Sequence, residues 1–544
     1  MDKELLLLIG GVGLFLLGMI ILTEGLRGLA GGAMRRVLTR FTKTPVTGAI
    51  TGALTTAVIQ SSSATTVAAV SFVAAGLLTF PQALGIIFGA NIGTTVTGWI
   101  IAILGFKLHM GQIVLPFIFI GVLLKLFGNA RLGQIGWALA GFSLLFIGIE
   151  SMQQGMAPYE GIITPSVFPD DTFFGRLQLV AIGAIITLVT QSSSAGVVAA
   201  LVALSAGSVT FSQAAAMVIG MDIGTTFTAA LATIGGSTAT RQTGYAHVIY
   251  NAMTGIMAFF LLGPFSGFAD TFIATGGPGS AQISLVAFHT AFNVLGVLLI
   301  LPFASPFARL IVRIVPERGP PLLQRLDEHL LSDPASAVDA VIATIRDILG
   351  SIIGIMSELL DPKRKMHFDA AQLKSVDEAL AETYRFVEKI QTDPAQKRVH
   401  NRHLATVHAL DHLIRLSHRC TQTHRIETLR SESRLYRLSG MLRNTIMSLL
   451  ENPVSSLEEG RLERVHSIFL KQRGVYRDRI VEHSARQQMS AHTALERLDS
   501  IRWLHRVSYH LWRIEHHLHR AEEVGKEPPA QSDTRKLELD VEED

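Results

Sequence analysis

The chain has 544 residues, with 47 Lys and Arg, 44 Asp and Glu, and a single cysteine, and its charged fraction of 17% lies below the roughly 25% of an ordinary soluble domain. Residues 1–320 hold 24 of the charged side chains, and residues 321–544 hold the other 67. This composition argues against a purely soluble enzyme, a fibrous or disordered chain, and a disulfide-stapled secreted protein. A net charge of +3 without a basic block argues against a nucleic-acid partner.

Several apolar segments of the N-terminal part are long enough to span a membrane, because a hydrocarbon core about 30 Å thick needs roughly 20 apolar helical residues. The first covers residues 5–26 and has only Thr23 and Glu24 near its end. Because it lacks a basic start and a clear small-residue cleavage site, we interpret it as a retained span rather than a secretion signal. The other predicted spans cover residues 112–128, 134–150, 245–262 and 282–303.

The same part of the chain contains an internal duplication. The segment Gln60-Ser61-Ser62-Ser63-Ala64 returns 131 positions later at residues 191–195. Residues 89–95 (Gly-Ala-Asn-Ile-Gly-Thr-Thr) return at the same offset as residues 220–226 (Gly-Met-Asp-Ile-Gly-Thr-Thr). Because both motifs keep their spacing, we interpret 1–320 as a transmembrane domain with one repeat at about 5–128, a second at about 134–262, and an extra span at about 282–303.

Charges in the connecting segments predict that the two repeats are inverted relative to each other. The linker after the first span carries five basic residues, whereas its counterpart in the second repeat carries four acidic residues and one Arg; these are Arg27, Arg35, Arg36, Arg40 and Lys43 against Glu150, Glu160, Asp170, Asp171 and Arg176. Basic short loops stay in the cytoplasm. We therefore expect an inverted-topology repeat of the kind found in secondary transporters, with the N-terminus outside and the C-terminal domain in the cytoplasm.

Each repeat is predicted to contain a broken membrane segment. Residues 46–60 and 64–78 are each too short for a full span, and the serines between them are poor helix interior because their hydroxyls compete for backbone groups. We predict a re-entrant helical hairpin with Gln-Ser-Ser-Ser near its tip, followed by a crossing element at 82–104 that is interrupted by Gly89, Gly93 and the two threonines after it. Irregular backbone at membrane depth is tolerated where it lines a cavity or is buried in protein.

The polar groups at these tips are suited to bind an anion together with a cation. Backbone N–H groups at the start of a half-helix favour an oxyanion, and carbonyl and hydroxyl oxygens favour a hard cation such as sodium. Neither motif contains Lys or Arg, so a bound anion would be neutralised by cations that bind with it. The alternative is that Ser, Thr and Gly only allow close helix packing, but the recurrence of both motifs at one spacing favours binding.

Asp222 is the asymmetric element, because its repeat mate is Asn91. A carboxylate inside a membrane is costly and is a functional candidate, which could bind sodium or carry a proton; the alternative is a structural hydrogen bond. His247 with Asn251, and His289 with Asn293, form two pairs four residues apart, for which we favour a packing role.

At this point the sequence resembles the type II sodium/phosphate cotransporters, including their bacterial members, over about residues 5–315. The resemblance rests on Gln-Ser-Ser-Ser-Ala-Thr-Thr, on Gly-Ala-Asn-Ile-Gly-Thr-Thr and on their second copies. It implies that the two hairpins form the phosphate and sodium sites, at Gln60–Ser63 and Gln191–Ser194. The second copy has Gly196 and Val197 where the first has Thr65 and Thr66. The candidate binding residues are Gln60, Ser61, Ser62, Ser63, Thr65, Thr66, Asn91, Thr94, Thr95, Gln191, Ser192, Ser193, Ser194, Asp222, Thr225 and Thr226.

Residues 321–524 have the alternating charged and apolar pattern of amphipathic helices, which predicts a cytosolic helical bundle. Two of its segments, at 411–416 and 510–515, faintly resemble the repeated motif of PhoU-like domains, although the Glu that usually ligates metal there is replaced by Ile414 and Trp512. Sixteen of the nineteen histidines lie after residue 320; we interpret them as a solvated, pH-tunable face and expect no transition-metal site. The acidic tail at 525–544 is predicted to be disordered.

These patterns together predict an all-α, multi-pass protein of the bacterial inner membrane that couples sodium to inorganic phosphate by alternating access. The alternatives are transport or export of another oxyanion, and a membrane phosphate sensor that does not transport. An enzyme is disfavoured, because no His and acid accompany the serine triplets. We expect no cofactor beyond sodium as coupling ion; the expected partners are phosphate, sodium, membrane lipid and a cytosolic regulatory protein bound by residues 321–524.

Overall fold

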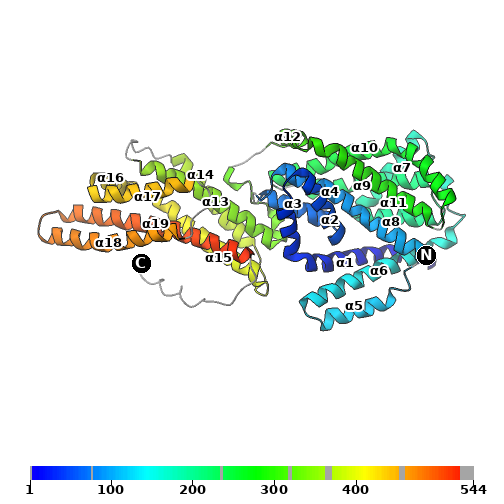
Figure 1. Cartoon of the computed structure of the whole chain (residues 1–544), viewed down its shortest axis with the longest axis horizontal. Coiled ribbons are helices and arrows are strands. Elements are labelled where there is room, and N and C mark those ends of the chain that lie inside the picture. The colour runs from blue at the N-terminus through cyan, green and yellow to red at the C-terminus, as the bar shows by residue number, and fades with distance from the viewer. Residues whose placement is uncertain are drawn as a thin grey trace. The chain divides into compact units, whose positions relative to one another are not determined.

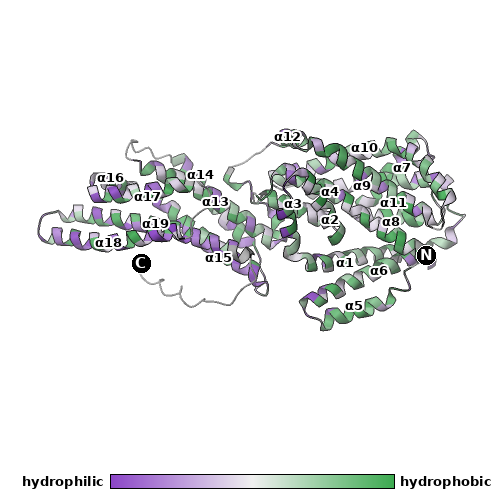
Figure 2. Cartoon of the chain, in the orientation of Figure 1, coloured by the Kyte–Doolittle hydropathy of each residue, from purple (hydrophilic) through white to green (hydrophobic). Residues whose placement is uncertain are grey.

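The computed structural model describes residues 3–74, 77–108, 110–232, 237–277, 279–316, 321–361, 370–451 and 460–526. Throughout these residues the regular structure is helical, which confirms the predicted all-α class (Figure 1). The chain divides into two compact units, Met1–Arg318 and Gly319–Asp544, called here the membrane unit and the helical unit. Figure 2 shows the contrast between the largely hydrophobic helices of the first and the mixed helices of the second.

Seven described helices are long and apolar enough to cross a membrane. Six belong to the membrane unit, and the seventh is α13 (Pro334–Leu359) of the helical unit. The sequence pattern of α13 predicts an amphipathic bundle helix, and most of its apolar side chains are buried within its own unit.

The first part of the membrane unit has a helix in each predicted segment, but the helix within the predicted span 112–128 has only 13 residues and is not among the seven candidate spans. This part comprises α1 (Lys3–Phe41), α2 (Pro45–Ile59), α3 (Ser62–Ala74), α4 (Phe80–Ile100), a π-helical turn (Ile101–Lys107) and α5 (Leu115–Phe127). The predicted linker after the first span is wrong, because α1 continues through the basic residues to Phe41 and only kinks at Gly31, where φ is +37°.

The second part repeats this order. It comprises α6 (Ala130–Met156), α7 (Phe173–Thr190), α8 (Ser193–Ser205), α9 (Phe211–Ala232) and α10 (Thr238–Thr275). The extra span is α11 (Ser280–Ile300), and the short α12 (Ala304–Ile314) ends the unit. Gln82 and its repeat mate Gln213 cap the starts of α4 and α9, each accepting a hydrogen bond from the backbone N–H three residues earlier.

The predicted interruption of the crossing element at Gly89 and Gly93 is wrong, because α4 is a continuous α-helix through both glycines. These glycines serve close packing instead. A side chain on Gly89 would overlap with the carbonyl oxygen of Ala49 on α2, and one on its repeat mate Gly220 would overlap with that of Val180 on α7. The absence of side-chain volume brings the two backbones together, as small residues do between membrane helices.

We expect Gly89→Ala to destabilise the membrane unit by about 3 kcal/mol, because the added methyl group meets rigid backbone rather than a side chain that can move. The thermal midpoint and the yield of monodisperse protein in detergent measure this. Gly13→Ala on the exposed side of α1, where nothing lies within 4 Å of the new methyl group, is the matched control and should not lower the midpoint. Equal midpoints for the two variants would contradict the packing role of Gly89.

The helices α1 and α6 pack against each other through glycines on both. Gly11 of α1 meets Met152 of α6. In these first helices the two repeats align at an offset of 130 rather than 131, and the repeat mates of these two residues, Gly141 and Leu22, also meet. Gly18 likewise faces Leu145, and Gly148 faces Phe15. As the residue number increases along α1, the number of the residue that it contacts on α6 decreases. The two helices therefore run antiparallel along the contact (Figure 1).

The helical unit contains α13, α14 (Ala370–Lys389), α15 (Lys397–Cys420), α16 (His424–Ser431), α17 (Ser433–Glu451), α18 (Arg461–Ala485) and α19 (Ala491–Lys526). Trp503 and Leu413 are among the side chains of α19 and α15 that form its core. A buried ion pair of 2.5 Å joins Arg402 of α15 to Asp339 of α13. The predicted disordered tail lies outside the described residues from position 527 onward, and residues 525–526 belong to α19.

The interpretation of the histidines as a solvated face is wrong for several of them. His466, His510 and His517 are at most 9% exposed, and they pack among other rings between α15, α18 and α19. His517 stacks on His408, and His466 stacks on Trp512. His510 and His517 lie within the apolar stripe of α19, and His466 is among the buried residues of α18, so all three are core residues.

Candidate functional site

The two Gln-Ser-Ser-Ser segments form the turns of two helical hairpins, α2–α3 and α7–α8. Gln60 has φ +59° and Gln191 has φ +53°, and they are the only non-glycine residues described in the membrane unit with positive φ. A left-handed backbone costs roughly 1–2 kcal/mol for a residue with a side chain. Such strained positions cluster at binding sites, and here the same strain occurs at both repeat mates.

The first serine of each triplet caps the helix that follows it. Ser61 Oγ accepts a hydrogen bond from Ala64 N, and Ser192 Oγ accepts one from Ala195 N, both at 3.2 Å. The next two serines are different, because the hydroxyls of Ser62, Ser63, Ser193 and Ser194 form no hydrogen bond within the described residues. Each hairpin thus presents two free hydroxyls beside the N–H groups of a helix N-terminus, a combination that suits an oxyanion.

The first hairpin tip is held by neighbouring helices. Gln60 Oε1 accepts a hydrogen bond of 2.7 Å from the hydroxyl of Thr97 on α4, and its backbone oxygen lies 3.4 Å from the hydroxyl of Thr23 on α1. Gln191 is exposed, and its amide nitrogen donates to the backbone oxygen of Leu188 on its own helix. The two tips therefore share a backbone conformation but differ in their contacts with neighbouring helices.

A threonine pair joins the two arms of the first hairpin only. Thr56 of α2 donates a hydrogen bond of 2.9 Å to the fully buried Thr65 of α3. In the second hairpin Gly196 stands at the position of Thr65, and the buried hydroxyl of Thr187, the mate of Thr56, has no partner within the described residues. The predicted ligand Thr65 is thus engaged inside the hairpin, and Thr66 lies half-buried beside it.

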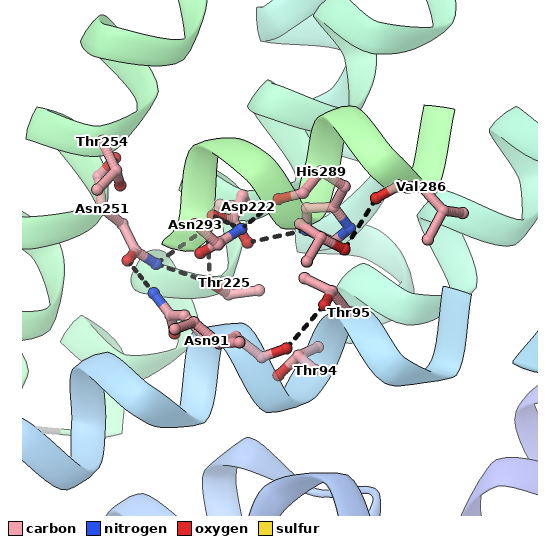
Figure 3. A network of polar contacts seen from close by, with 12 residues as sticks. Asn91, Thr94, Thr95, Asp222, Thr225, Asn251, Thr254, Val286, His289 and Asn293 are labelled. Atoms are coloured by element: carbon pink, nitrogen blue, oxygen red, sulfur yellow. Dashed lines mark hydrogen bonds and ion pairs between the residues drawn. The ribbon is translucent and has the colours of Figure 1, made fainter. Parts of the chain in front are cut away.

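The Gly-x-Asx motifs meet in a buried polar network that joins α4, α9, α10 and α11 (Figure 3). Asn91 of α4 donates to Asn251 Oδ1 of α10, and the amide nitrogen of Asn251 lies 3.2 Å from the backbone oxygen of Asp222 on α9. On the other side of Asp222, Asn293 Nδ2 lies 3.4 Å and His289 Nε2 lies 3.6 Å from its carboxylate oxygens. All five residues are less than 9% exposed.

This network is rich in oxygen and carries one acidic side chain. Asn293 Oδ1 is buried and has no hydrogen-bond donor within the described residues, although it belongs to the residue whose nitrogen contacts Asp222. The hydroxyl of Thr225 lies 3.3 Å from Asn251 Nδ2 and donates to the backbone oxygen of Asp222. Carboxylate, amide and hydroxyl oxygens are the ligands that hard cations such as sodium prefer.

The predicted site residues therefore fall into two groups. Asn91, Asp222 and Thr225 are brought together, whereas Thr94, Thr95 and Thr226 donate to backbone oxygens of their own helices. Within the described residues, no hydrogen bond links the hairpin tips to the Asp222 network.

Sequence reasoning missed the strongest partners of Asp222. For the two His/Asn pairs we favoured a packing role, but Asn251, His289 and Asn293 contact Asp222 or Asn91. The sequence did contain a sign of this role, because each pair places two polar residues four positions apart inside an otherwise apolar span. Polar residues are costly within a membrane, so their presence there indicates a function.

Comparison with known proteins gives one family. The model of the Na+/Pi-cotransporter family matches residues 14–154 and 172–277. The chain is 31% identical over 304 residues to YqeW of Bacillus subtilis (strain 168), which covers 56% of this chain and 96% of that protein.

Several relatives have names that state an activity. A protein of Escherichia coli (strain K12) named for inorganic phosphate export, YjbB, is 29% identical over 379 residues, which is 68% of this chain and 67% of that protein. Sodium-dependent phosphate transport protein 2A of Rattus norvegicus is 38% identical over 101 residues, 18% of this chain and 16% of that protein. No solved structure matches the chain significantly. The family and these named relatives are transporters rather than enzymes, and the chain, a membrane protein by its apolar helices, belongs to the Na+/Pi-cotransporter family.

Proposed function

We propose that this protein is a secondary transporter that moves inorganic phosphate across the cell membrane together with sodium by alternating access. The observation that carries the proposal is the buried Asp222 network, in which a motif from each repeat meets the two His/Asn pairs. An intramembrane carboxylate beside the unpartnered amide oxygen of Asn293 is suited to a cation whose binding neutralises it. Oxyanion binding would fall to Ser62, Ser63, Ser193 and Ser194 and the adjacent helix N-termini.

Inverted repeats would provide the two alternating states. Each contact between α1 and α6 recurs with its partners exchanged between the repeats, as a two-fold axis requires. Because the paired helices run antiparallel, such an axis would be perpendicular to them and, if both span, would lie in the membrane plane. This supports the inverted topology, in which rocking of one repeat against the other exposes the site to either side. The basic end of α1 would lie in the cytoplasm, with the helical unit.

The helical unit is proposed to be a PhoU-like regulatory domain that binds a cytosolic partner. Domain order and the two short segments around Ile414 and Trp512 support this assignment. Among the described residues, no three His, Cys, Asp or Glu side chains are gathered as metal ligands.

The test is sodium-dependent uptake of labelled phosphate by the full chain in liposomes. We expect Ser62→Ala or Ser193→Ala to weaken phosphate affinity by roughly 10- to 100-fold, because each removes a hydrogen bond to a charged ligand. Ser71→Ala on α3, whose hydroxyl donates to Val67 of its own helix, is the matched control and should transport like the wild type. Wild-type uptake by both tip variants would refute the assignment.

Export is a second candidate, and the name of the Escherichia coli relative favours it. Liposomes loaded with phosphate and exposed to a sodium gradient of either sign separate the two directions. Competition by sulfate or arsenate in the same assay tests for another oxyanion. Saturable phosphate binding without any sodium-driven accumulation would replace the transporter by a sensor.

A further inference from the structure

The membrane unit has an apolar groove away from the polar network. It has a volume of about 470 Å³ and lies between α10, α11 and α12. Its floor includes the buried side chains of Ile300 and Phe307, and its rim includes Met253, Leu299 and Leu310, which are 48–57% exposed. This size lies within the range of small-molecule sites, and an apolar groove on a membrane-spanning unit opens toward lipid chains.

One polar group in the groove lacks a partner. The hydroxyl of Tyr250 is buried and forms no hydrogen bond within the described residues, although the ring of Tyr250 packs tightly on Phe88, with 4.4 Å between centroids. The hydroxyl of Thr254, which also lines the groove, donates to backbone oxygens of α10. A buried hydroxyl without a partner costs about 1–3 kcal/mol, so an occupant with a hydrogen-bond acceptor is favoured there.

Two arginines border the same groove. On α12, Phe307, Ala308 and Ile311 are buried, whereas Arg309 and Arg313 are exposed. Arg309 and Arg313 follow the lining residues Pro306 and Leu310 by three positions, so each arginine is the neighbour of a lining residue on the surface of the helix. Neither arginine has an acidic partner in the described part of the chain. A short helix with one apolar and one basic face is typical of the membrane interface.

We propose that this groove binds one anionic glycerophospholipid. An acyl chain fills the apolar groove, an ester carbonyl accepts the hydrogen bond of Tyr250, and Arg309 and Arg313 contact the phosphate headgroup. Charge complementarity decides the occupant. The groove combines an apolar channel, a buried hydroxyl donor and two unpaired cations, and an anionic lipid has an acyl chain, a carbonyl acceptor and a negative headgroup to match them. The proposal does not depend on which solute the protein carries.

The site has a structural route to the Asp222 network. Tyr250 is followed on α10 by Asn251, and Phe88, on which Tyr250 packs, lies one helical turn before Asn91 on α4. A lipid that contacts Tyr250 would therefore help to fix the position of Asn251 and, through Phe88, that of Asn91, and both asparagines belong to the network.

The test is native mass spectrometry of the full chain equilibrated in detergent with phosphatidylcholine and phosphatidylglycerol. We expect one phosphatidylglycerol to be retained per chain. The double variant Arg309→Gln/Arg313→Gln should lose roughly 30-fold in affinity for phosphatidylglycerol while its weaker affinity for phosphatidylcholine stays unchanged, since each basic residue near the headgroup contributes a similar increment. Met257→Trp, which fills the groove, should abolish retention of either lipid.

Two control variants keep the experiment decisive. Phe260→Trp adds the same ring on an exposed position of α10 outside the groove, and Arg131→Gln removes an exposed charge elsewhere on the unit; both should retain the lipid. Equal retention by all variants would overturn the proposal in favour of a general lipid annulus. A dimer that persists without lipid and is lost in Met257→Trp would overturn it in favour of a second copy of the chain.

Discussion

Replacing Asp222 with asparagine is expected to lower the initial rate of sodium-driven phosphate uptake by at least ~100-fold, because removing one partner of a buried ionic interaction costs several kcal/mol. The carboxylate is the single formal negative charge of the buried network, and it lies beside the unpartnered Oδ1 of Asn293. Without that charge, a sodium ion would have to leave water for neutral ligands only. The sodium concentration needed for half-maximal uptake should rise steeply.

The substitution is well suited to a test because the fold should survive it. Asparagine is the residue that the first repeat carries at the matching position, Asn91, and an amide oxygen at position 222 can still accept from Asn293 Nδ2. The hydrogen bonds from Asn251 and Thr225 go to the backbone oxygen of residue 222 and do not depend on its side chain. Asp270→Asn, which removes the same charge from an exposed position on α10, is the control and should transport normally. If Asp222→Asn keeps the sodium dependence of the wild type, Asp222 does not bind the coupling ion.

The hairpins could be predicted from the sequence, whereas the role of the glycines in α4 could not. Short apolar segments on either side of Gln-Ser-Ser-Ser leave no room for a full span, and the structure ends α2 at Ile59 and begins α3 at Ser62. For α4 the same reasoning counted Gly89 as a helix breaker. Glycine is unfavourable in an isolated helix, but tertiary contact outweighs propensity when it allows the carbonyl of Ala49 to approach the helix backbone.

The partners of Asp222 could not be predicted by comparing the two repeats. Asn251 stands in the second repeat, where the first has Ile120 at the matching position, and Asn293 lies in the extra span. The repeats therefore identified Asn91 and Asp222 as mates but gave no indication of what holds them. In the helical unit, His510 and His517 fall at core positions of an apolar stripe on α19, formed by Val507, Leu511, Ile514, Leu518 and Ala521. This spacing predicts that the two rings are buried, whereas their polarity predicts that they are exposed.

Those buried histidines lead to the second large effect, a loss of stability of the helical unit in acid. Burial is the main cause that lowers the pKa of His412 and His505 to about 4 and that of His510 and His517 to about 3, and nearby arginines such as Arg513 and Arg506 lower these pKa values further. In the unfolded chain each ring has a pKa near 6.5. The folded pKa is the lower one, so the stability that these rings contribute is complete above about pH 6.5 and is lost as the pH falls toward 4.

We expect the free energy of opening of α15 and α19 to fall by on the order of 5 kcal/mol between pH 7 and 4.5, after allowance for solvent screening of the partly exposed rings. Hydrogen exchange of peptides from both helices in the full chain, corrected for the pH dependence of intrinsic exchange, measures this energy. The variant His510→Gln/His517→Leu should reduce the pH dependence by about half, since it removes two of the four rings whose pKa is lowered furthest. His418→Gln/His492→Gln, at exposed positions, should leave it unchanged.

The size of this pH dependence distinguishes the two interpretations of the histidines. Rings on a solvated face would keep nearly the same pKa in the folded and unfolded chain, so their protonation would leave stability almost unaffected. Rings packed as His517 is, with neither ring nitrogen hydrogen-bonded to a described residue, cannot accept a proton without bringing an unpaired charge into the core. An acid-sensitive bundle whose sensitivity is lost with His510 and His517 therefore requires that these residues form part of its core, and an acid-insensitive bundle would place them on the surface.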